Sequence, residues 1–91
     1  MRLLPWTNLD GHPCYLSADD HRSSLSLLAD SVEVAQLASG KDVLAGARAV
    51  LADERAGEFA VRSALTRATE SLEDVIRIAV SRGGRLLEHG G

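Results

Sequence analysis

The residues most capable of chemistry gather near the start of this sequence: His12, Cys14, Asp19, Asp20 and His21. Imidazole, thiolate and carboxylate groups are the usual protein ligands of transition metals. Their spacing matches no zinc pattern, because a C-x2-C pair is absent and a structural zinc site needs four ligands. We therefore expect no metal and no cofactor here. The aspartates should start a helix, His12 should lie in a turn, and Cys14 should be a small buried apolar residue.

The sequence also contains no set of side chains with the spacing of a known catalytic site. Cys14 lies between Pro13 and Tyr15 in what reads as extended chain, away from a helix N-terminus that would activate a thiol. Three carboxylates lie close together on one predicted helix, with arginines at helical spacing, and we interpret them as solvated ion pairs: Glu70, Glu73 and Asp74. The glycine pairs lack the lysine and hydroxyl residue of a phosphate loop. We expect no enzyme.

The aromatic residues favour a binding role over catalysis. Trp6 and Tyr15 are two of only three aromatic residues, and both lie in the first 18 residues. Tryptophan and tyrosine are common at the centres of protein interfaces. They also suit the open end of a helical bundle. Both readings stay open: Trp6 and Tyr15 either pack on the helices or contact a partner protein.

The strongest pattern is an apolar stripe in the last third of the chain. Its members follow one another at steps of four, three, four, three and four, which is a heptad repeat: Val61, Leu65, Ala68, Leu72, Val75 and Ala79. Such a stripe makes a narrow seam on one side of a helix. It must pack against another helix, from this chain or from a second one.

Two long helices should therefore carry the chain. The first is expected over residues 19–53, with a start signal at Ser17 and a possible bend at 39–40, since its apolar face keeps one phase across Gly40. Two helices separated at Gly40 are the alternative. The second is expected over residues 58–82. Gly57 should act as a left-handed stop before it, and Gly83-Gly84 should end it, leaving 83–91 as a frayed tail.

The first 18 residues should form a short arm. Asp10-Gly11 favours a turn with a positive backbone dihedral, because glycine has no Cβ to clash, and it lies between two short apolar segments. The sequence thus predicts a single all-α domain over residues 1–91. It should be a long antiparallel helical hairpin with an N-terminal extended arm or β-hairpin.

A second apolar set on the first helix points away from its main face: Leu27, Val34, Leu37 and Ala45. A two-helix core is thin, and a chain of this length buries a small share of its surface. Both apolar surfaces are used if two copies form a four-helix bundle. We therefore expect a homodimer, with Leu27, Val34 and Leu37 as further candidates for partner contact.

Charge and composition indicate which partners and which cellular compartment to expect. Ten basic residues face thirteen acidic ones, a net charge of −3, which argues against nucleic acid as the partner. No apolar stretch approaches the length of a membrane span. One cysteine allows no internal disulfide, so we expect a cytoplasmic protein. The abundance of arginine, alanine and leucine suggests a bacterium with GC-rich DNA.

The sequence names no function by itself. We expect a small non-enzymatic interaction or regulatory protein that works as a homodimeric helical bundle and docks a larger protein. One alternative is a DNA-associated transcription regulator, with a degenerate helix-turn-helix at Ala38–Asp42. The other is a small-ligand or metal sensor that uses the N-terminal arm.

Overall fold

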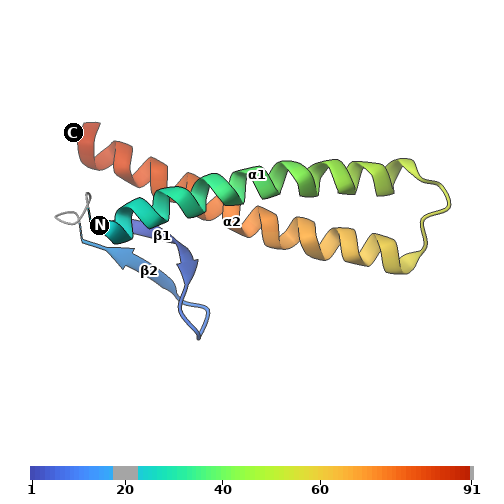
Figure 1. Ribbon diagram of the computed structural model, residues 1–91, viewed down its shortest axis with the longest axis horizontal. Helices are drawn as coiled ribbons and strands as arrows, with labels where there is room; N and C mark the ends of the chain where they lie inside the picture. The colour runs from blue at the N-terminus through green and yellow to red at the C-terminus, as the bar shows by residue number, and fades with distance from the viewer. Residues whose placement is uncertain (18–22, 91) are drawn as a thin grey trace.

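The computed structural model describes residues 1–17 and 23–90, with side chains up to residue 87. Within these residues the order of elements is β1 (Arg2–Thr7), β2 (Pro13–Leu16), α1 (Ser24–Ala52) and α2 (Glu58–Gly90). The two helices run antiparallel as a hairpin, and the strands form a small sheet beside one end of it (Figure 1). The expected helical hairpin is confirmed, and so is the short N-terminal hairpin of strands.

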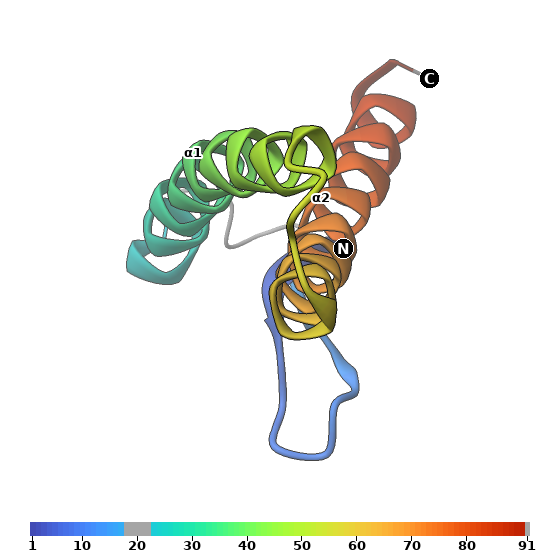
Figure 2. The ribbon, with the colours of Figure 1, turned by 90° about the vertical axis from the view of Figure 1, so that its right-hand side faces the viewer.

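The molecule is elongated. Its principal extents are 53, 29 and 20 Å, and its radius of gyration is 16.2 Å. A compact chain of 91 residues would have a radius of gyration of about 12 Å. The helices cross at an angle and separate on either side of the crossing, as Figure 2 shows. On one side the strands pack against them.

The strands pair antiparallel, with Leu3 opposite Tyr15. Their turn is built on Asn8, whose side-chain Oδ1 accepts from the backbone N–H groups of Asp10 and His12, both at 2.9 Å. Gly11 has a φ of 81°, a conformation that side chains with a Cβ rarely adopt. The positive backbone dihedral expected at this glycine is therefore confirmed.

α1 begins later than the sequence predicted. Ser23 has an extended backbone, and its hydroxyl accepts from the N–H of Ser26 at 3.2 Å, so Ser23 is the N-cap. The helix accordingly starts at Ser24 and not at residue 19. Most of the expected start signal falls in 18–22, outside the described residues. Downstream, α1 is a single helix through Gly40, as the constant apolar phase indicated.

Gly40 lies where the two helices come close together. A Cβ added there would be 3.1 Å from the Ser71 hydroxyl oxygen and 3.8 Å from a methyl group of Val75. Glycine thus lets α2 come near at the crossing. Glycine inside a helix usually lowers stability by about 1 kcal/mol relative to alanine, and the close packing that it permits here offsets that loss.

The end of α1 agrees with the predicted residue 53 to within one residue, but both predicted glycine stops are wrong. α1 ends at Ala52, and Asp53, with extended backbone, donates its N–H to the Val50 carbonyl at 3.2 Å. Gly57 has no positive φ and is not a left-handed stop. Gly83 and Gly84 also lack a positive φ, and α2 continues through them to Gly90. Because neither Gly83 nor Gly84 adopts a left-handed conformation, α2 continues past both residues.

The apolar core lies beneath the strands and not along the helix pair. Leu4, Leu16 and Ala29 are buried together, and Trp6 and Cys14 pack against them. Two of the three residues of this cluster come from the strands, and Ile78 of α2 is buried as well. The N-terminal hairpin is therefore part of the folded core of this small chain and not an appended arm. No helix in residues 1–17 and 23–90 has a segment long and apolar enough to cross a membrane.

Candidate interaction groove

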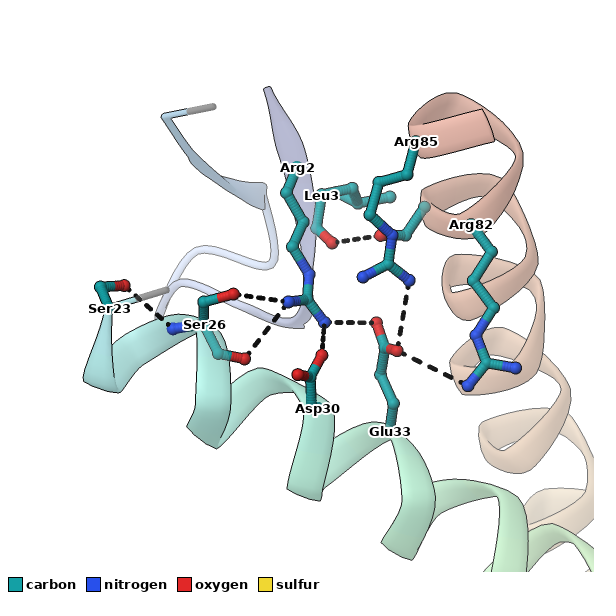
Figure 3. A network of polar contacts seen from close by, with 9 residues as sticks. Arg2, Leu3, Ser23, Ser26, Asp30, Glu33, Arg82 and Arg85 are labelled. Carbon is teal, nitrogen blue, oxygen red and sulfur yellow. Dashed lines mark hydrogen bonds and ion pairs between the residues drawn. The ribbon is translucent and has the colours of Figure 1, made fainter. Parts of the chain in front are cut away.

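An ionic network centred on the buried side chains of Arg2 and Glu33 fixes the strands to both helices (Figure 3). Arg2 of β1 donates from Nη1 to the Ser26 hydroxyl at 2.9 Å, and from Nη2 to Asp30 at 2.7 Å. The same Nη2 lies 3.3 Å from Glu33 Oε2. Arg82 and Arg85 of α2 reach the other oxygen of Glu33, at 3.7 and 3.5 Å. Glu33 thereby connects β1, α1 and α2.

Two further hydrogen bonds attach β1 through its backbone. The Ser81 hydroxyl of α2 donates to the Leu3 carbonyl at 2.8 Å, and the Gln36 side chain of α1 donates to the Pro5 carbonyl at 2.8 Å. Each helix therefore satisfies one carbonyl of β1. These bonds hold the strands at one end of the helical hairpin, and the other end stays open.

The open end contains an apolar groove between the helices. Its first part has a volume of about 460 Å³ and lies beside the crossing, between the Leu37–Ala47 segment of α1 and the Ala68–Val75 segment of α2. Its second part, of about 440 Å³, extends toward the connection between the helices. Ala47 and Ala68 line both parts. The two parts therefore form one continuous channel, which we call the interhelical groove.

Leucines at seven-residue spacing line this groove from both helices. α1 contributes Leu37, Leu44 and Leu51, and α2 contributes Leu65 and Leu72. All except Leu37 are exposed in the single chain. Residues seven apart lie on the same side of a helix, so each helix presents a row of leucines to the same open channel.

The groove is poor in groups that do chemistry. Lys41, Ser71 and Asp53 are its polar lining residues, and they are separated along its length. No three of the His, Cys, Asp and Glu residues in the described part of the chain lie close enough to hold a metal ion. The groove is thus shaped for apolar contact.

The predicted partner-contact residues fall in different places. Trp6 packs against the buried core, whereas Tyr15 is 57% exposed on the outer side of the sheet. Leu27 and Val34 are exposed on α1, outside the two parts of the groove, but Val34 and Leu37 together line a neighbouring hollow of about 480 Å³. Leu37 is half-buried and lines the groove. Ala45 is exposed. The structure therefore brings only Leu37 of this set to the channel.

The predicted heptad stripe lies mainly along the groove. Ala68 and Val75 are half-buried in its wall, and Val61, Leu65 and Leu72 line it with exposed side chains. Ala79 is exposed beyond it. The more buried side of α2 is made mainly of smaller residues, followed by Ile78 near the strands: Ala64, Ala68, Ser71 and Val75. In the single chain, four of the six residues of the stripe therefore remain exposed to solvent.

The residues considered for metal or catalytic chemistry are scattered. His12 is exposed in the turn, Cys14 is half-buried beside the core, and His21, like Asp19 and Asp20, lies outside the described residues. Asp74 forms an ion pair with Arg77 at 3.3 Å, as the helical spacing indicated. Glu70 and Glu73 are exposed on α2.

Sequence reasoning missed the two residues that organise the N-terminal end, Arg2 and Glu33. Nothing in their spacing marks them, since they come from different elements and meet only in the folded chain. Leu44 and Leu51 were missed as well. Their seven-residue spacing from Leu37 could have indicated them, but they do not belong to the main apolar face predicted for the first helix.

The helix-turn-helix alternative loses its turn in the structure, because α1 runs without interruption across Ala38–Asp42. Comparison of the chain with protein-family models, with curated proteins and with solved structures finds no match.

Proposed function

We propose that this chain is a small non-enzymatic interaction protein that works as a homodimeric helical bundle. The observation that supports this proposal is the size of its exposed surface. The chain exposes 6803 Å², whereas a compact monomer of 9.7 kDa would expose about 5,100 Å². The excess of about 1,700 Å² is of the order that one subunit buries in a stable dimer.

The character of that surface supports the same proposal. Large apolar side chains account for much of it, including six that are at least 65% exposed in the two helices: Val34, Leu51, Phe59, Leu65, Leu86 and Leu87. So many exposed apolar side chains are unusual on a small monomer and suit an interface. Association through the interhelical groove would bury those that line it, Leu51 and Leu65 among them, and would thicken a core that consists of few residues.

The homodimer would act by presenting its remaining surface to a larger protein. Exposed Tyr15 on the sheet and exposed Leu27 and Val34 on α1 are the residues we assign to that contact. We place the protein in the cytoplasm, because a single cysteine suits a reducing compartment.

Light scattering after size exclusion, at micromolar concentration, tests the proposal. A mass near twice 9.7 kDa is expected. A folded chain with the mass of a monomer throughout this concentration range would contradict it.

A further inference from the structure

We infer that the interhelical groove is occupied by a second copy of this chain, with the leucine rows of the two copies packed against each other. This inference rests on the proposed homodimer and adds the surface through which it forms. Because the residues that line the groove lie toward the end of the hairpin away from the strands, we place the dimer interface there.

The leucine rows supply the first argument. The row Leu37, Leu44 and Leu51 on α1 and the row Leu65 and Leu72 on α2 open into one channel. In a four-helix bundle, every helix contributes apolar residues at this spacing to a shared interior. One hairpin provides two of the four rows, and a second hairpin related by a two-fold axis provides the other two. The same apolar surface then serves both subunits, as an isologous interface requires.

The dimensions of the groove agree with such a partner. From Leu37 to Leu51 the α1 row spans about 21 Å, at 1.5 Å for each residue. That length accommodates a helical segment of two heptads. Half-buried Ala47 and Ala68 lie at the junction of its two parts and leave space between the larger leucines. Alternation of small and large residues allows facing layers to interdigitate.

Charge favours a second copy over a strongly charged partner. The charged residues from 37 to 80 nearly balance: Lys41, Arg48, Arg55, Arg62, Arg67 and Arg77 are basic, and Asp42, Asp53, Glu54, Glu58, Glu70, Glu73 and Asp74 are acidic. A mixed and nearly neutral surface produces little repulsion between identical copies. It also offers no field that would attract a nucleic acid or a highly charged protein.

Three glutamate substitutions test the location of the interface. Leu72→Glu and Leu44→Glu place a carboxylate in the groove, one from each helix. Leu27→Glu is the matched control, because Leu27 is 61% exposed and Leu72 is 59% exposed, but Leu27 lies outside the groove. The dimer dissociation constant, measured by sedimentation equilibrium, should rise by about 100-fold or more for the groove variants, since a buried unpaired charge is strongly unfavourable. It should stay within about threefold of the wild type for Leu27→Glu.

Helical circular dichroism of each variant accompanies the measurement. Leu72→Ala is a milder second variant that introduces no charge, and it should raise the dissociation constant about tenfold or more. A dimer that resists all three groove variants would overturn the assignment of the interface while leaving the homodimer intact. So would a dimer that only Leu27→Glu dissociates. A monomeric wild-type protein would overturn both this inference and the proposed function.

Discussion

Arg2 and Glu33 form an ion pair of 3.3 Å in which the two side chains are only 9% and 3% exposed. Desolvation of two charges is costly, and such a pair is tolerated only where further partners satisfy both groups. Arg2 has Ser26 and Asp30, and Glu33 has two arginines of α2, while Arg2 Nε and Glu33 Oε2 are buried without a hydrogen bond. This pair therefore sets the position of β1 relative to both helices. The small core beside it provides the buried apolar surface.

Replacement of Arg2 by methionine should lower the free energy of unfolding by about 2–3 kcal/mol, because Glu33 keeps a buried charge with weaker compensation. Arg82 and Arg85 remain nearby and limit the loss. Urea denaturation followed by circular dichroism measures it. Arg62→Ala is the control: Arg62 pairs with Glu58 at 3.9 Å on the exposed surface, so the change should stay within about 0.5 kcal/mol.

The double variant Arg2→Met with Glu33→Leu separates the cost of an orphaned charge from the contribution of the pair. Apolar residues of similar volume often replace a buried ion pair without loss. Most of the stability lost in Arg2→Met should therefore return. A double variant as unstable as the sum of the two single variants would show that the pair itself contributes the stability.

Local patterns predicted the elements of this fold, and long-range contacts explain what they missed. Asp10-Gly11 specified the turn, and the apolar phase across Gly40 specified one continuous α1, because both signals are contained in a few adjacent residues. The start of α1 was placed too early because the signal at Ser17 was taken as the cap, whereas Ser23 is the N-cap in the structure. The network around Glu33 could not be foreseen, since its partners are distant in sequence.

One wall of the interhelical groove could be predicted from a local sequence pattern, but the groove itself could not. The heptad stripe identified which side of α2 is apolar, and Leu65 and Leu72 do line the channel. A repeat does not reveal whether its partner comes from the same chain. Gly40 and Ser71 bring the helices together along a stripe of smaller residues, which leaves the leucines facing outward.

Substitutions of Gly40 and Gly46 should have opposite effects on stability. Gly46 has open space where a Cβ would be, so Gly46→Ala should stabilise by about 0.5–1 kcal/mol through helix propensity. Gly40→Leu would force a large side chain against Ser71 and should destabilise by about 1–3 kcal/mol. Thermal unfolding of both variants measures the difference. Equal effects at the two positions would contradict the close approach of the helices at Gly40.

Alanine at Gly83 or Gly84 tests the extension of α2 past the predicted stop. Both positions are helical and have open space for a Cβ, so each substitution should stabilise by about 0.5–1 kcal/mol. Gly11→Ala, at a φ of 81°, should instead destabilise by about 1 kcal/mol. Destabilisation by alanine at Gly83 would indicate that the helix ends there after all.

Thermal stability should depend on protein concentration if association through the interhelical groove completes the core. Mass action stabilises a folded state that binds a second copy, so the melting temperature of the wild type should rise by several degrees between about 1 and 100 micromolar. Leu72→Glu removes the association without disturbing the buried residues Leu4, Leu16 and Ala29. Its melting temperature should therefore be lower and independent of concentration. Differential scanning calorimetry or circular dichroism across this range measures both. A wild-type melting temperature that does not change with concentration would show that the single hairpin supports its own fold.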